Sequence, residues 1–174
     1  MNTSDHALEP GQACLQKGKS PFARPRAYHA PATRKANGRP LRVVIVGDSP
    51  VLLRVLSTLL EAQNNTQLIG SATDGYGAVR RVLELRPDLV LMDLHLPGIN
   101  GLEASREIKS QPQAPAVIMV TADDTPGCRA AALAAGTDGF VDKQHLFAQL
   151  PPAIRKLFPE EGEKPESLSQ ESPA

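Results

Sequence analysis

Four polar residues follow apolar segments of this 174-residue chain and could do chemistry together: Asp48, Asp93, Thr121 and Lys143. Two carboxylates form a hard-oxygen site that suits Mg²⁺, which takes one or two carboxylates plus waters and phosphate oxygens. A hydroxyl and an ammonium beside them would bind the oxygens of a phosphoryl group. Together these are the groups needed for phosphoryl transfer to an aspartate.

Asp93 has the most informative position of the four. The run Leu89–Met92 is continuously apolar, and Pro97-Gly98 breaks the chain soon after the carboxylate. Parallel strands that are buried on both faces have such continuous apolar runs. Asp93 is therefore predicted at the carboxyl end of a central strand, where open α/β sheets bind their ligands. The alternative is an aspartate that only caps a turn.

The elements that position these residues alternate between strand and helix from residue 41 to 158. Strands are predicted at 41–47, 67–72, 89–93, 116–121 and 139–141, each followed by a helical pattern. Such βα units form a doubly wound, five-stranded parallel α/β sheet with right-handed crossovers. The first, third and fourth runs are the most apolar, which favours the flavodoxin-like (βα)5 order 2-1-3-4-5. This order brings the four polar residues to one edge of the sheet.

Two helical features need separate mention. Pro151-Pro152 lies inside the last helical segment, so we expect a break or kink there. Gly75-Tyr76-Gly77 resembles part of a dinucleotide-binding loop, but Arg80 replaces the third glycine and the preceding strand is weak. We therefore reject a dinucleotide site.

The ends of the chain differ from its middle. Residues 1–40 are basic and rich in proline and alanine, and residues 159–174 are acidic. Neither end has enough apolar residues to offset chain entropy, so we expect two disordered tails around a domain at 41–158. The formal net charge is zero, so the composition as a whole does not indicate a nucleic-acid or membrane partner.

The compartment is predicted from three sequence features. The amino terminus lacks the apolar core of a signal peptide, and no apolar run approaches the length of a membrane span. Cys14 and Cys128 show neither disulfide nor zinc spacing, so we interpret both as free thiols. We expect a soluble, cytoplasmic protein.

Four motifs carry a resemblance to a known family. They are residues 44–50, 91–101, 120–122 and 139–143. In this order and on these elements, the chain resembles the response-regulator receiver domain of two-component signalling over about 41–158. The resemblance implies that Asp93 is the phosphoacceptor. It also implies that Mg²⁺ is bound by Asp48, Asp93 and the backbone carbonyl of His95.

The same resemblance assigns roles to three further residues. Thr121 would be the switch hydroxyl, Phe140 the aromatic switch residue, and Lys143 the cation that pairs first with Asp93 and then with the phosphate. The protein would be a signalling protein rather than an enzyme. It would receive its phosphoryl group from a histidine kinase or phosphotransfer protein, and it would contact an unknown output protein through the face near Phe140.

Two positions depart from the family pattern. Gly47 stands where the first of two acidic residues is usual, so we expect weaker Mg²⁺ binding. Gln144 follows Lys143 at a position where the family often has proline. Receivers of the subfamily with a helix-turn-helix output domain also commonly lack that proline. The acidic end is too short for such a domain, so the chain resembles a stand-alone receiver. Direct DNA or membrane binding is not expected, and a homodimer stays open.

Two other functions remain as alternatives. Gly47 keeps open a pseudo-receiver that acts as a constitutive protein-interaction module. A flavodoxin-like enzyme or cofactor binder would share the fold, but the sequence lacks a phosphate-cradling loop. Taken singly, Asp48 could be only a helix cap, Thr121 only a strand terminator and Lys143 only a solvated lysine.

Overall fold

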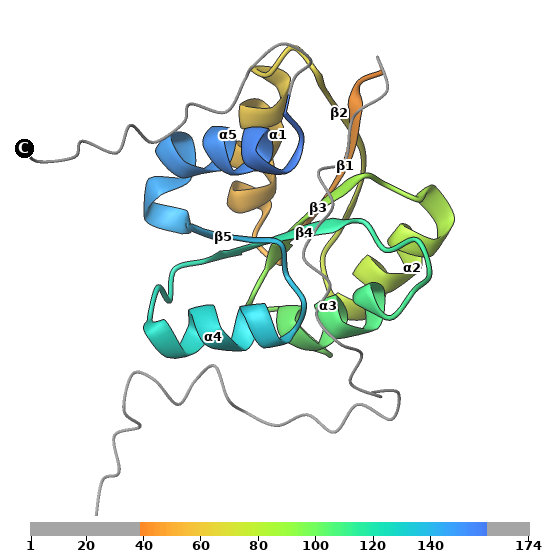
Figure 1. Cartoon of the computed structure of the whole chain (residues 1–174), viewed down its shortest axis with the longest axis vertical. Helices are drawn as coiled ribbons and strands as arrows, with labels where there is room; N and C mark the ends of the chain where they lie inside the picture. Colours follow the sequence, from red (N-terminus) through yellow and green to blue (C-terminus); the bar gives the residue numbers. More distant parts are fainter. Residues whose placement is uncertain (1–38, 160–174) are drawn as a thin grey trace, which may run out of the picture.

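The computed structural model describes residues 39–159, which form a five-stranded parallel sheet between two layers of helices (Figure 1). The strands are β1 (Leu41–Val46), β2 (Thr66–Ala72), β3 (Leu89–Asp93), β4 (Ala116–Thr121) and β5 (Gly139–Asp142). The helices are α1 (Pro50–Glu61), α2 (Gly75–Leu85), α3 (Gly101–Lys109), α4 (Pro126–Ala134), the 3₁₀ turn η2 (Lys143–His145) and α5 (Leu146–Leu157). The strand order β2-β1-β3-β4-β5 confirms the prediction.

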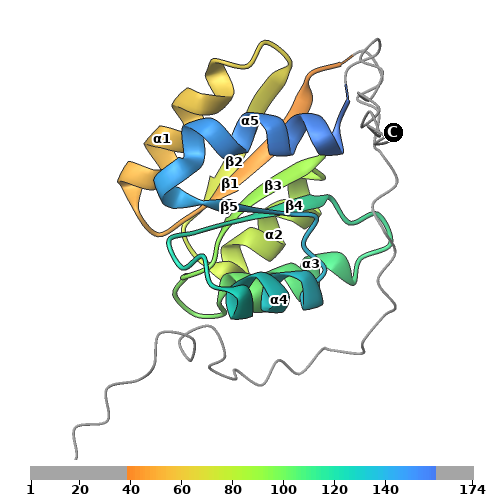
Figure 2. The ribbon, with the colours of Figure 1, turned by 60° about the vertical axis from the view of Figure 1, so that its left-hand side comes forward.

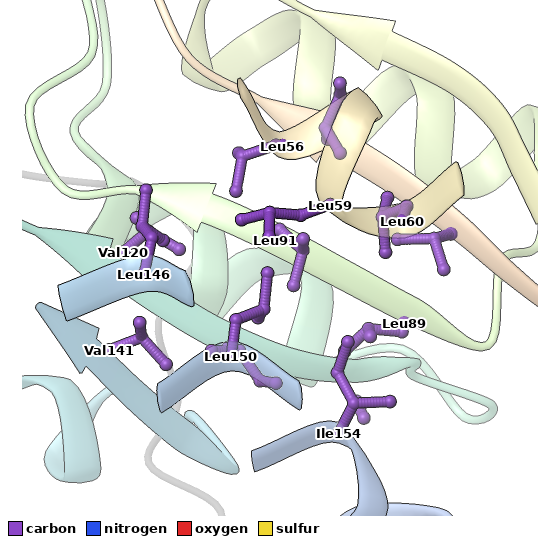
Figure 3. Close-up of a cluster of buried hydrophobic side chains, with 14 of the residues drawn as sticks. Leu56, Leu59, Leu60, Leu89, Leu91, Val120, Val141, Leu146, Leu150 and Ile154 are labelled. Atoms are coloured by element: carbon purple, nitrogen blue, oxygen red, sulfur yellow. The ribbon is translucent and has the colours of Figure 1, made fainter. Parts of the chain in front are cut away.

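Side chains of the central strands alternate between two cores. Helices α1 and α5 cover one face of the sheet, and α2, α3 and α4 cover the other (Figure 2). Val43 and Ile45 pack on the α1 and α5 side, whereas Val44 and Val46 pack on the opposite side. Figure 3 shows the first core, in which Leu150 of α5 lies over the sheet. Burial on both faces explains why these strands are apolar without interruption.

Capping residues begin the four helices that follow β1, β2, β3 and β4. The side chains of Ser49, Asp74 and Thr125 accept backbone N–H groups in the first turns of α1, α2 and α4. Asn100 and Glu103 form a capping box at the start of α3. Such caps satisfy N–H groups that have no partner within the helix. They therefore fix where each helix begins at the edge of the sheet that holds Asp93.

The break that was one of the two expectations at Pro151-Pro152 is absent, because α5 runs without interruption from Leu146 to Leu157, and a kink there stays a prediction. A proline inside a helix leaves the carbonyl four residues earlier without its usual donor. Here these carbonyls belong to Phe147 and Ala148, which are both exposed and can bond water. The buried face of α5, which includes Leu150, holds the helix against the sheet.

The predicted tails lie outside the described residues, apart from Arg39, Pro40 and Pro159 at their inner ends. Cys14 lies outside them as well. Cys128 is not a free cysteine, so the expected free thiol is wrong there, because spacing rules recognise only local patterns. Within residues 39–159, no helix is long and apolar enough to span a membrane.

Ion pairs hold the amino ends of the strands. Lys109 of α3 pairs with Asp138, whose Oδ2 also accepts the Val117 N–H at 2.7 Å, and the Lys109 ammonium donates to the Pro115 carbonyl at 2.9 Å. Asp138 directly precedes β5. These contacts therefore join α3, β4 and β5 at the edge opposite Asp93.

A second pair lies at the same edge, beside β1 and β3. The guanidinium of Arg39 donates two hydrogen bonds of 2.8 Å to Asp88, and the Arg42 N–H donates to the same carboxylate at 2.8 Å. Asp88 directly precedes β3. The pair therefore ties the start of the described chain to the central strands.

Candidate functional site

Asp93 is the last residue of β3, and its carboxylate is fully buried. Its Oδ1 accepts the backbone N–H of His95 at 3.2 Å, and its Oδ2 lies 2.7 Å from the ammonium of Lys143. A carboxylate can accept about four hydrogen bonds. These two contacts therefore leave it capacity to bind further donors or a cation.

Lys143 reaches Asp93 from a strand that is not its neighbour. It begins the turn η2 after β5, and β4 lies between β5 and β3. The long lysine side chain crosses the end of β4, and about a quarter of its surface (27%) stays exposed. The Lys143 side chain thus contacts the buried Asp93 carboxylate while part of it stays open to solvent.

Thr121 ends β4, between the strands that carry Asp93 and Lys143. Its side chain is fully buried, and its hydroxyl oxygen accepts the Asp123 N–H at 3.1 Å. In β5, Asp142 is the register partner of Thr121. The hydroxyl therefore lies at the same edge as the Asp93–Lys143 pair and is tied to the loop that leads to α4.

Asp48 follows β1 and is exposed. β1 pairs with β3, with Val46 opposite Met92, so Asp48 leaves the sheet on the Asp93 side. Residues 39–159 contain no group of three or more His, Cys, Asp or Glu side chains that could hold a metal ion. Mg²⁺ needs only one or two carboxylates when water completes its shell. Asp48 and Asp93 supply two carboxylates at this end of the sheet, and their binding of Mg²⁺ together with the His95 carbonyl stays a prediction.

Gly47 is buried between β1 and α1. The packing around it leaves little room for the acidic side chain that is usual at this position in the family. A Cβ placed there would lie 3.1 Å from Cδ2 of Leu52. This contact is tight, but a leucine side chain can move by a few tenths of an ångström. Leu52 thus occupies the space that a side chain at position 47 would need.

Phe140 is half-buried on β5 and packs against the core below α4. The guanidinium of Arg129 lies 4.7 Å from its ring centre, which is a cation–π distance. Arg129 in turn binds Asp124 in the loop after β4, with Nη2 at 2.7 Å from Oδ2. This connection could not be predicted from the sequence, because it depends on how α4 packs beside β5.

The structure brings Asp93 and Lys143 into direct contact and places Asp48, Thr121 and Phe140 around the same end of the sheet. One residue at this edge received no role from the sequence. Asp142, which directly precedes Lys143, accepts hydrogen bonds from the turn that carries it. Its place in the 139–143 motif was the only sign of this.

A domain with this strand order and a buried aspartate at the end of β3 is typical of receivers in phosphorelay signalling. The family model of the response regulator receiver domain matches residues 43–155, and the chain belongs to this family. The response regulator domain of Thermotoga maritima CheB is 33% identical, with a TM-score of 0.62 over 68% of this chain and 94% of that one.

Two curated relatives are similar over the same region. A protein-glutamate methylesterase/protein-glutamine glutaminase of a Nocardioides species is 33% identical over 138 residues, which is 72% of this chain and 38% of that protein. The probable transcriptional regulatory protein TcrX of Mycobacterium tuberculosis is 33% identical over 125 residues, which is 72% of this chain and 53% of that protein. The chain thus spans between about a third and a half of these relatives.

Proposed function

We propose that this chain is a response regulator that accepts a phosphoryl group on Asp93 and passes the signal on through a protein-binding face. The donor would be a histidine kinase or a phosphotransfer protein, and the chain would act in the cytoplasm as a signalling protein rather than as an enzyme. One observation carries the proposal. A buried carboxylate lies 2.7 Å from the ammonium of a partly exposed lysine and keeps capacity for further ligands.

The transfer would use this pair directly. A carboxylate oxygen of Asp93 would form a bond to phosphorus as the bond to the donor breaks, and the leaving group would keep the electron pair. The Lys143 ammonium would then bind a phosphoryl oxygen, which requires only a small shift from its present contact. Thr121 would donate its hydroxyl to another phosphoryl oxygen, because such a bond is strong in a buried site.

Asp48, Asp93 and the His95 carbonyl would hold Mg²⁺. When bound, the ion would neutralise charge that develops on the phosphoryl oxygens. Gly47 supplies no carboxylate, so we propose weaker metal binding than a second acidic residue would give.

The output face would be the surface of α4, β5 and α5 around Phe140. Thr121 is tied to the loop after β4, and Asp124 of that loop holds Arg129 against the Phe140 ring. A movement of Thr121 towards a phosphoryl group would thus shift the loop after β4, and the loop would in turn shift Arg129 against the Phe140 ring. Phosphorylation then needs to supply only the energy difference between two arrangements.

The test is incubation of the full chain with acetyl phosphate and Mg²⁺, followed by intact-mass measurement. The wild type should gain the mass of one phosphoryl group, and Asp93→Asn should gain none while keeping its circular-dichroism spectrum. Asp88→Asn, which changes an aspartate at the other edge, is the matched control and should still be labelled. Labelling of folded Asp93→Asn would contradict the assignment.

Gly47 supports the second candidate, a pseudo-receiver that binds its partner constitutively. An absence of labelling in the wild type with several donors and high Mg²⁺ would favour it. Amide-shift mapping with beryllofluoride separates the two candidates further. Shifts that never reach residues 125–157 would argue against the proposed route to the output face. The interpretation as a stand-alone receiver stays a prediction.

A further inference from the structure

The ammonium of Lys143 can stay in contact with the Asp93 carboxylate only if the turn that carries Lys143 is fixed in position. The lysine side chain is flexible, so the position of its ammonium depends on where its backbone is fixed. Lys143 is the first residue of the 3₁₀ turn η2, which is three residues long and joins β5 to α5. A short 3₁₀ turn has weak internal hydrogen bonds, so its position depends on contacts from outside it.

Asp142 supplies these contacts from the residue just before Lys143. Its Oδ1 accepts the Gln144 N–H at 2.9 Å, and its Oδ2 lies 2.7 Å from Nδ1 of His145. Its own N–H donates to Oε1 of Gln149 on α5 at 3.0 Å. Asp142 therefore fixes both residues that follow Lys143 and joins the turn to α5.

The contact with the turn requires an acceptor oxygen on the side chain of residue 142 and a backbone N–H donor at residue 144. The Gln144 N–H and the His145 ring keep the pKa of Asp142 below its ordinary value, so it is ionised near neutral pH. Asp142 is buried, which strengthens these bonds. A proline at position 144 would have no N–H to donate. Gln144, which keeps its backbone N–H, thus allows Asp142 to hold the turn.

We propose that Asp142 is the positioning residue for Lys143, and that it acts on phosphoryl transfer only through that lysine. The inference rests on the proposed function, because it concerns the lysine that would bind the transferred group. Asp142 does not touch Asp93 in any described contact, and its register partner in β4 is Thr121.

The first measurement does not depend on phosphorylation. The full chain is treated with a limiting acetylating reagent, and the modification rate of Lys143 is read by peptide mass spectrometry relative to exposed Lys156. In Asp142→Ala, Lys143 should react several-fold faster, because its ammonium no longer stays on Asp93. Asp74→Ala is the matched control, since Asp74 is also a carboxylate cap but serves α2. An unchanged Lys143 rate in Asp142→Ala would overturn the inference.

The second measurement is the labelling rate with acetyl phosphate and Mg²⁺. Asp142→Ala should be slower by roughly tenfold, the effect of a lost charged hydrogen bond, whereas Asp74→Ala should label at the wild-type rate. In a Lys143→Met background, Asp142→Ala should slow labelling no further. A full additional loss there would show that Asp142 acts independently of Lys143, and would overturn the inference.

A conservative variant guards against a folding defect. Asp142→Asn keeps an oxygen that can accept the Gln144 N–H, so it should restore most of the labelling rate and most of the protection of Lys143. An Asp142→Asn protein that folds and behaves like Asp142→Ala in both measurements would overturn the role of the Gln144 contact. If the wild type is never labelled, the proposed function fails, while the acetylation result still decides the positioning of Lys143.

Discussion

Two lysine–aspartate pairs lie at opposite ends of the parallel strands and differ in the hydrogen-bond partners of their charged groups. The amino edge is the end of the sheet where the strands begin, and the carboxyl edge is the end that holds Asp93. At the amino edge, Asp138 binds Lys109 and the Val117 N–H through one oxygen, and Lys109 also binds the Pro115 carbonyl. At the carboxyl edge, Asp93 binds the Lys143 ammonium and the His95 N–H through different oxygens.

The difference lies in what each pair holds together. The Lys109 pair links a side chain of α3 to one that directly precedes β5, and it also bonds backbone groups of Pro115 and Val117 at the start of β4, so it joins three segments. The Lys143 pair joins two side chains, and Lys143 is partly exposed to solvent. We therefore expect the same two residue types to contribute to stability at one edge and, under the proposed function, to phosphoryl transfer at the other.

The largest expected effect comes from breaking the amino-edge pair. Lys109→Met should lower the free energy of unfolding by about 3 kcal/mol, because it leaves the largely buried Asp138 carboxylate without its cation. Urea denaturation measures this change. Lys156→Met, on the exposed side of α5, is the control and should change stability little. Asp93 should still be phosphorylated in Lys109→Met under conditions where this variant is folded. Loss of labelling in the folded variant would show that the two pairs do not have separate roles.

A second change adds charge beside the carboxyl-edge pair. Gly47→Asp should tighten Mg²⁺ binding by up to about tenfold, since an added carboxylate attracts the cation even through water. Gly47→Ala places the same Cβ against Leu52 without the charge, so it separates packing from electrostatics. Titration with Mg²⁺ should show tighter binding in the aspartate variant alone. Equal affinities in both variants would mean that the metal is bound elsewhere.

The smallest effect is expected at the exposed pair of the amino edge. Burial alone would raise the pKa of Asp88, but the hydrogen bonds from Arg39 and the Arg42 N–H lower it below its ordinary value. A carboxylate with a lowered folded pKa stabilises the protein fully above about pH 4 and loses this contribution as the pH falls through the folded pKa.

Arg39→Ala should therefore reduce stability by no more than about 1 kcal/mol at pH 7, and by less at pH 3. Urea denaturation at the two pH values measures the difference, with Arg155→Ala on the exposed side of α5 as the control. A larger loss at pH 3 than at pH 7 would contradict the assigned direction of the Asp88 pKa.

The fold was predictable because burial leaves a clear pattern in the central strands. β3 and β4 are buried at every residue, whereas β2 is mostly exposed or half-buried, and this contrast gave the strand order. The course of α5 could not be derived in the same way. Pro151 and Pro152 indicate a break by local rules, and only the packing of α5 on the sheet overrides them.

The positions of site residues were predictable where those residues end a strand or directly follow one. The contact between Asp93 and Lys143 follows from the strand order and the reach of a lysine. The contacts of Asp142 and Arg129 could not be predicted, because they depend on the path of the β5–α5 turn and on the packing of α4. Neither leaves a periodic pattern in the sequence.

Gly101 determines the direction in which the site can change shape. A Cβ at this position would overlap the backbone carbonyl oxygen of Asp93, so α3 begins in direct contact with the strand end. The Gly101 N–H also bonds the Leu94 carbonyl at 2.9 Å, and the capping box of Asn100 and Glu103 fixes the first turn. The backbone of Asp93 is thus closely packed on its α3 side. Under the proposed function, we therefore expect a new group on Asp93 to be accommodated on the side of Thr121 and Lys143, and the resulting rearrangement to spread towards α4 and α5 rather than evenly through the domain.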